Sequence, residues 1–285
     1  MNSNGEHSGI SSLLIATDGS VYADVATECG AWLASRLGAR TTVLYVIDAR
    51  RLAGHFIRHI SEILESFPSE GITDRVRDYY RKQGNEALKR AASICERYRV
   101  ACETDLQTGN VVKIVADASA DADLLVIGER GEDEEFETGF LGSVSEKLVR
   151  KVNGPVLLTG LEFREFRRAL LAYDGSDGAR GAMRMLARLA VALGMDVDAV
   201  QLVEEGEPTT VLKEVASYFK DYPVHLSTHY LTGDSHSVII DHAKEIGCDL
   251  MVMGAYENRL ADSLALGTAT DYLVRNSPVP VLVYH

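Results

Sequence analysis

Two segments of this chain hold residues that could contact a ligand. The first is Ala16-Thr17-Asp18-Gly19-Ser20, at the end of an apolar run. Asp18 would emerge from a buried strand, Gly19 permits a tight turn, and Ser20 can cap the next helix. The motif recurs as Asp174-Gly175-Ser176. Asp18 therefore either contacts a ligand or only closes an Asx turn, and the motif alone leaves both interpretations open.

The second segment is Gly128-Glu129-Arg130-Gly131, which is followed after a ten-residue loop by Gly142-Ser143 at a predicted helix start. Two glycines three residues apart let a ligand approach the backbone. A helix start offers N–H groups, a hydroxyl and the positive end of the helix dipole, which together favour an anion. Each element alone is unspecific. In a doubly wound domain with an aspartate after its first strand, they indicate a nucleotide site.

Motifs for catalysis or metal binding are lacking in the sequence. It contains no GxxxxGK[ST] loop, no GxGxxG after a strand and no evident nucleophile–base set. We therefore expect no catalytic residue and at most slow hydrolysis of a bound nucleotide. His55 and His59 lie one helical turn apart without a third ligand, and His225 and His229 share a face of a predicted edge strand. We interpret both pairs as exposed and expect no metal site.

The chain is a tandem duplication. LLIATDGS at 13–20 returns as ALLAYDGS at 169–176, DADLLVIG at 121–128 returns as GCDLMVMG at 247–254, and LGSVSEKLVRKVNGPVLL at 141–158 returns as LGTATDYLVRNSPVPVLV at 266–283. These blocks keep the same order in both halves. The sequence predicts two domains, 11–160 and 168–285, joined near Glu162–Arg168.

Within each half, short apolar runs alternate with helical periods, which predicts a doubly wound α/β domain with a parallel sheet. In the first half we expect strands at Leu13–Thr17, Thr42–Ile47, Val100–Leu106, Leu124–Ile127 and Val156–Thr159. The helices between them are expected at Ser20–Leu37, Thr73–Tyr98, Asn110–Ala120 and Ser143–Val152. Gly38 and Gly194 should each end a first helix in the left-handed conformation.

The first half carries an insertion of about thirty residues, mostly at 48–71. Its apolar residues recur at three- and four-residue steps, which is one face of a helix. The simplest interpretation is an extra packing helix. A lid over the site and a homodimer surface are the alternatives.

With these motifs, each half resembles the universal stress protein family. The resemblance implies a five-stranded sheet of order 3-2-1-4-5, and one branch of that family binds ATP. It places Asp18, after Ala16 and Thr17, at the nucleoside and the Val46 backbone at the adenine. Ribose and phosphates, with or without Mg²⁺, would lie against Gly128, Gly131, Gly142, Ser143, Val144 and Ser145. The matching positions of a weaker second site are Asp174, Leu202, Gly254, Gly267, Thr268 and Thr270.

The two halves depart from the family pattern in different ways. The first has ten residues between its second and third glycines instead of nine, and six carboxylates between Glu129 and Glu137. The second has Glu257 in place of a glycine. Because Glu257 would hold a negative charge beside the phosphates, we expect the first half to be the stronger site.

The resemblance also bears on assembly. In the family, the last strands of two domains pair antiparallel across a two-fold axis. Here Pro155–Thr159 and Pro280–Tyr284 are such strands, and an apolar edge is a liability unless it is paired. We therefore predict that the two halves form a pseudo-dimer within one chain.

Composition narrows the class of protein. Lys and Arg number 29 against 42 Asp and Glu, so the net charge of −13 disfavours nucleic acid and anionic membranes as partners. Four cysteines without a CxxC pair, and no evident signal peptide, favour the cytoplasm. We expect an ATP-binding regulatory protein of the stress response, with unknown protein partners. The alternatives are an interaction module without nucleotide and a slow ATP hydrolase.

Overall fold

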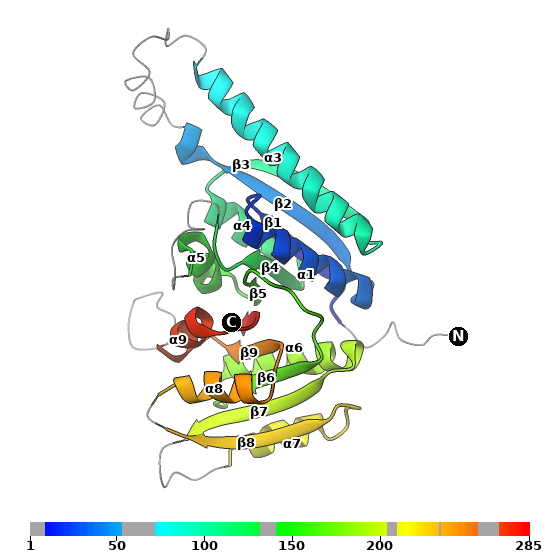
Figure 1. Cartoon of the computed structure of the whole chain (residues 1–285), viewed down its shortest axis with the longest axis vertical. Coiled ribbons are helices and arrows are strands. Elements are labelled where there is room, and N and C mark those ends of the chain that lie inside the picture. Colours follow the sequence, from blue (N-terminus) through cyan, green and yellow to red (C-terminus); the bar gives the residue numbers. More distant parts are fainter. Residues whose placement is uncertain (1–8, 53–71, 132–140, 204–209, 234, 256–267) are drawn as a thin grey trace, which may run out of the picture.

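The computed structural model describes residues 9–52, 72–131, 141–203, 210–233, 235–255 and 268–285. Its ten strands form one sheet of order β3-β2-β1-β4-β5-β10-β9-β6-β7-β8 (Figure 1). Each repeat therefore contributes five strands in the order 3-2-1-4-5. All pairs within a repeat are parallel. The predicted fold class is confirmed.

The elements of the first repeat lie within a few residues of their predicted bounds. They are β1 (Ser12–Thr17), α1 (Val21–Leu37), β2 (Arg40–Asp48), the short 3-10 helix η1 (Ala49–Leu52), α3 (Ile72–Arg97), β3 (Cys102–Gly109), α4 (Val111–Ser119), β4 (Leu124–Gly128), α5 (Ser143–Lys151) and β5 (Pro155–Thr159). The amphipathic segment expected within 48–71 lies largely outside the described residues.

The second repeat follows the same order. Its elements are β6 (Arg168–Ala172), α6 (Asp177–Leu193), β7 (Asp196–Val203), α7 (Leu212–Phe219), β8 (Leu226–Thr232), α8 (Ser237–Glu245), β9 (Leu250–Gly254), α9 (Thr268–Asn276) and β10 (Val281–Tyr284). No described helix is both long and apolar enough to span a bilayer.

The first helix of each repeat begins and ends as predicted. The hydroxyls of Ser20 and Ser176 cap α1 and α6, each accepting a hydrogen bond from the third amide downstream at 3.1 Å. Gly38 and Gly194 end these helices with φ of 68° and 69°. A Cβ at Gly30 would lie 2.6 Å from Ile15 on β1, so this glycine lets α1 approach the sheet closely.

Two hydrophobic cores run along the sheet, one on each face. The first joins α1, α3, α6 and α7 to the strands, and the second joins α4, α5, α8 and α9 to the opposite face. Each core contains side chains of both repeats. The repeats therefore share their interior instead of folding around separate cores.

The repeats meet at their last strands, as predicted. β5 and β10 pair antiparallel, with Leu157 opposite Leu282 and both side chains buried. The segment that connects the repeats packs against α1, where Phe163 and Phe166 contact the Trp32 ring at centroid distances of 5.5 and 5.3 Å. The pseudo-dimer is thus one continuous sheet within the chain.

Candidate functional site

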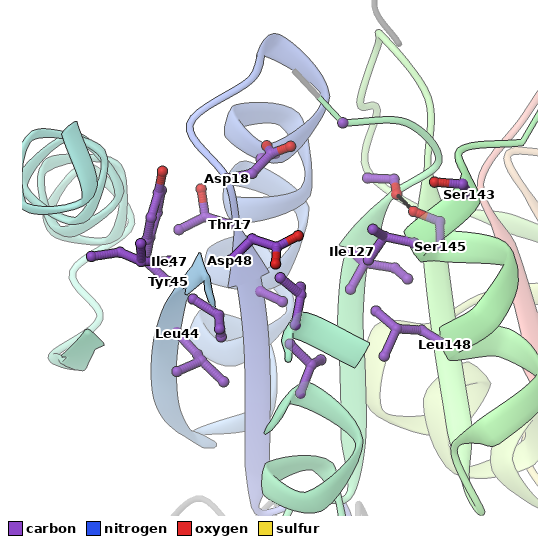
Figure 2. A pocket seen from close by; sticks show the side chains of 18 of the residues that line it. Thr17, Asp18, Leu44, Tyr45, Ile47, Asp48, Ile127, Ser143, Ser145 and Leu148 are labelled. Atoms are coloured by element: carbon purple, nitrogen blue, oxygen red, sulfur yellow. Dashed lines mark hydrogen bonds between the residues drawn. The ribbon is translucent and has the colours of Figure 1, made fainter. Parts of the chain in front are cut away.

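A cavity of about 420 Å³ lies at the carboxyl ends of β1, β2 and β4 (Figure 2). Strand order reverses between β1 and β4, which is where open α/β sheets bind ligands. Nine of the ten residues predicted for the first site line this cavity, namely Ala16, Thr17, Asp18, Val46, Gly128, Gly131, Ser143, Val144 and Ser145. The tenth, Gly142, is the N-cap of α5.

Asp18 closes a turn and also lines the cavity. Its Oδ1 accepts a hydrogen bond from the Ser20 amide at 3.0 Å, which is the Asx turn considered from the sequence. Its Oδ2 faces Gly131, because a Cβ built there would lie 2.7 Å from that oxygen. Gly19 has the positive φ of 84° that this turn requires. Both sequence interpretations of Asp18 are therefore compatible with the structure.

Gly128, the last residue of β4, packs closely against α1. A Cβ on Gly128 would lie 2.8 Å from Cβ of Tyr22, so Gly128 makes room for the first turn of α1. Gly254 occupies the same place against Gly178 and Ala179 of α6. Gly128 therefore has a packing role in addition to the ligand approach expected from the sequence.

The first turn of α5 faces the cavity. Gly142 has extended backbone angles and caps the helix without a side-chain hydrogen bond, so no capping side chain competes with an anion there. Further along, the buried Ser145 hydroxyl donates to the Gly128 carbonyl at 2.8 Å. Thr270 makes the matching bond to Gly254 at 3.3 Å. The proton of the Ser145 hydroxyl is thus used within the protein, and its amide remains the group suited to an anion.

The opposite side of the cavity is an apolar slot at β2 and α4. Its walls are Leu44, Val46, Val111, Val115 and, from α5, Leu148. Such walls suit the faces of a flat aromatic base. An apolar slot at one end and a helix N-terminus at the other match the two ends of a nucleotide.

Sequence reasoning missed several polar residues of this cavity. Asp48, Arg50, Arg51 and Tyr80 line it, and the Arg51 guanidinium lies 5.7 Å from the centroid of the Tyr80 ring. The alternation of β2 was the available signal, since Leu44, Val46 and Asp48 fall on one face. The sequence predicts that this strand ends at Ile47 and places Asp48 in the insertion, whereas β2 continues to Asp48.

Helix α3 contacts the turn after β1 that contains Asp18. The Arg90 guanidinium donates to the Gly19 carbonyl at 2.6 Å and lies 3.6 Å from the Asp24 carboxylate. Burial raises the pKa of Asp24, and the charge of Arg90 partly offsets this. Arg90 therefore ties α3 to the loop between β1 and α1.

The second repeat has a smaller cavity of about 170 Å³ in the equivalent place. Asp174, Leu202, Gly254 and Thr270 line it, as does His236 of the segment before α8. Asp174 closes the same Asx turn, to the Ser176 amide at 3.0 Å. Thr268 is the first residue of α9. Gly267 and Glu257 of this repeat lie outside the described residues, as do residues 132–137 of the first repeat.

The His229 side chain is 41% exposed, and it also has neighbours that the sequence does not indicate. It lies on the edge strand β8, with Nε2 3.4 Å from the buried carboxylate of Asp198 and its ring 4.9 Å from that of His242. Burial and the neighbouring His229 lower the pKa of His242. His225 is exposed, as predicted. Across the described part of the chain, no three His, Cys, Asp or Glu side chains gather closely enough to hold a metal ion.

The chain is similar to known proteins. The model of the universal stress protein family matches residues 9–160 and 209–285. The universal stress protein Slr1230 of Synechocystis sp. is 25% identical over 283 residues, covering 95% of this chain and 99% of its own.

Solved structures share the fold over the whole chain. A universal stress protein from Archaeoglobus fulgidus superposes with a TM-score of 0.77 at 23% identity, covering 98% of both chains. A protein from Pseudomonas aeruginosa UCBPP-PA14 described as a putative universal stress protein has a TM-score of 0.64 at 16% identity, covering 98% of this chain and 94% of its own.

Proposed function

The chain belongs to the universal stress protein family as a tandem member, and we propose that it is a regulatory protein whose first repeat binds ATP. The observation that carries the proposal is the cavity of about 420 Å³, which combines an apolar slot with the first turn of α5. The base would enter the slot beside Val46. The phosphates would lie at the helix start, and any Mg²⁺ would arrive with them.

The charges around the cavity support an anionic ligand. Arg50, Arg51 and Arg130 line it together with Asp18 and Asp48, whereas the net charge of the whole chain is −13. Helix α5 adds the positive end of its dipole. The lining of the cavity is thus less negative than the protein as a whole, and the helix start of α5 is the feature that favours phosphate there.

The size of the second cavity supports unequal sites. Small-molecule cavities usually measure about 300–1,000 Å³, and the second measures about 170 Å³ against about 420 Å³ for the first. His236 lines the second cavity, whereas no histidine is among the described residues that line the first. We therefore expect one strong ATP site per chain.

Matched substitutions that introduce one negative charge into each repeat test this proposal. Val144 and Ala269 occupy equivalent positions in the first turns of α5 and α9, and each lines its own cavity. A glutamate near a helix N-terminus is compatible with the helix but repels phosphate, at a cost of about tenfold or more in affinity. Calorimetry on the full chain should give one site, which Val144→Glu weakens and Ala269→Glu leaves intact.

Several outcomes would contradict the proposal. An absence of ATP binding would favour the interaction module without nucleotide. Two equal sites, or a loss caused by Ala269→Glu alone, would overturn the assignment to the first repeat. Thermal melts of both variants serve as the control for folding.

We expect turnover of bound ATP to be slow. Arg50, Arg51 and Arg130 line the first cavity, but its described lining includes no lysine, and the sequence shows no P-loop and no evident nucleophile–base set. Rapid phosphoryl transfer combines such groups. Phosphate release in the presence of Mg²⁺ should stay well below the ~1–100 s⁻¹ typical of kinases. A rate in that range would favour the hydrolase alternative.

A further inference from the structure

Asp48 is a charged side chain at the apolar end of the first cavity. It is the last residue of β2, and its side chain is 14% exposed. It lies on the same face as Leu44 and Val46, because side chains alternate along a strand. In Figure 2 the carboxylate of Asp48 points into the cavity, above the side chain of Leu44.

The Asp48 carboxyl is ionised at neutral pH. Hydrogen bonding to Arg50 lowers its pKa, although partial burial acts in the opposite direction. An ionised carboxylate only accepts hydrogen bonds, and its two oxygens provide about four acceptor sites. Any ligand group that meets Asp48 must therefore be a donor, because an oxygen or ring nitrogen with a lone pair would be repelled.

The contact with Arg50 leaves room for a ligand to compete. The Arg50 Nε donates to the two Asp48 oxygens at 3.0 Å and 2.9 Å, its Nη2 donates to Oδ2, and the Arg50 amide donates to Oδ1 at 2.9 Å, but the Arg50 side chain is 78% exposed. The Arg50 end of this pair lies in solvent, where water competes for its hydrogen bonds and weakens the pair. A donor held by the apolar slot can replace one of these bonds at small cost.

The orientation of a nucleotide follows from the two ends of the cavity. Its phosphates belong at the first turn of α5, beside β4, and so its base belongs at β2, between the walls formed by Val46, Val111 and Val115. The faces of the base contact these walls, which leaves its polar edge to meet the end of β2. Asp48 is the anionic group at that end.

We propose that Asp48 selects the base by accepting a hydrogen bond from the 6-amino group of adenine. The inference rests on the proposed nucleotide site and adds a determinant of specificity to it. A 6-oxo purine would bring an oxygen against the carboxylate and is disfavoured. A purine without a substituent at carbon 6 loses the hydrogen bond without adding repulsion.

The test compares ATP with purine riboside 5′-triphosphate, which differs only by the missing amino group. Calorimetry on the unmodified full chain should give at least about tenfold tighter binding of ATP, as expected for a hydrogen bond to a charged group. Asp48→Ala should bring the two affinities within about threefold of each other. Asp48→Asn, which keeps a neutral acceptor, should retain part of the preference.

Arg50→Gln is the matched control, because it removes the partner of Asp48 and keeps the carboxylate. It should preserve the ratio of the two affinities. Equal binding of both nucleotides by the unmodified chain would overturn the inference while leaving the proposed function intact. A ratio of affinities that is unchanged in Asp48→Ala would also overturn the inference. The same holds if Arg50→Gln abolishes the preference for ATP as fully as Asp48→Ala does. Failure of the unmodified chain to bind either nucleotide would instead overturn the proposed function.

Discussion

The glycine at 131 is required by its neighbour and not by its own backbone angles. It is absent from the residues with positive φ, whereas a Cβ there would lie 2.7 Å from Oδ2 of Asp18. Asp18 is held on its other oxygen by the Ser20 amide. The carboxylate therefore cannot move away without breaking the turn after β1.

We predict that Gly131→Ala weakens ATP binding about tenfold, or ~1.4 kcal/mol, because the new methyl group displaces Asp18 at the cavity wall. Calorimetry gives the affinity. Gly154→Ala is the matched control, since a Cβ there meets nothing within 4 Å. Equal affinities for Gly131→Ala and Gly154→Ala would show that the position of Asp18 does not matter to the ligand.

Sequence motifs identified the turns and the helix start that surround the first cavity, but not all of the side chains that line it. Asp18, Gly131 and Ser143 follow motifs that the repeats make visible. Asp48 and Arg50 carry no motif, and Tyr80 reaches the cavity from α3, far along the chain. Their contribution depends on how β2 continues and how α3 crosses the sheet, and neither follows from local spacing.

At the scale of elements, one aspartate joins the beginnings of two neighbouring strands. Oδ2 of Asp123, just before β4, accepts hydrogen bonds from the amides and hydroxyls of Ser11 and Ser12 at 2.8–3.0 Å. Partial burial acts to raise the pKa of Asp123, but these bonds outweigh it and the pKa is lowered. At Asp249, the equivalent residue, burial dominates and the pKa is raised.

A lowered pKa in the folded state means that ionised Asp123 stabilises the protein above its unfolded pKa of ~3.9 and that this is lost as pH falls. Asp123→Asn should lower the free energy of unfolding by about 1 kcal/mol at pH 7. The difference from the unmodified chain should stay constant down to about pH 5 and shrink below about pH 4. Urea denaturation measures it.

Asp121→Asn provides the control for this experiment, because Asp121 is exposed and lies two residues earlier. It should change stability by less than about 0.5 kcal/mol. If the loss of stability caused by Asp123→Asn instead grows as pH falls, the pKa of Asp123 is not lowered in the folded protein.

Helices and strands were the most predictable scale. Alternating apolar and helical periods placed α3 at Thr73–Tyr98 from the sequence, against the observed Ile72–Arg97. The weakest strand in the sequence was expected at Val100–Leu106 and lies at Cys102–Gly109. It is an edge strand with half-buried polar side chains, so hydrophobic alternation marks it poorly.

At the scale of the whole molecule, the shared cores predict that the repeats unfold together. Trp32 is the single tryptophan and lies in the first repeat, whereas Leu282 lies in β10 of the second. Leu282→Ala should cost about 2–5 kcal/mol, as buried truncations do. The substitution should shift the unfolding transition reported by Trp32 fluorescence by the same amount as the transition reported by far-ultraviolet circular dichroism.

Leu161→Ala is the control, because this side chain is 57% exposed. A Trp32 transition that stays unchanged in Leu282→Ala would mean that the repeats unfold independently despite the continuous sheet.

The relation between the repeats was predictable, and their inequality was only partly so. The repeated motifs and the family resemblance led to the β5–β10 pairing, which the structure confirms. The size difference between the cavities has a different origin. It depends on how the strands and helices assemble, which brings His236 to the wall of the smaller cavity beside Gly254 and Leu202.

The pairing of β5 with β10 within one chain has a consequence for how such a protein can evolve. In an assembly of two identical chains, every substitution appears on both sides, so a gain at one site is imposed on the other. Here the two repeats have separate coding sequences within one gene. Residues 160–167 link them covalently, so they are always present in equal numbers. One half can therefore keep a binding site under selection while its partner drifts toward another role, and both still complete the same sheet.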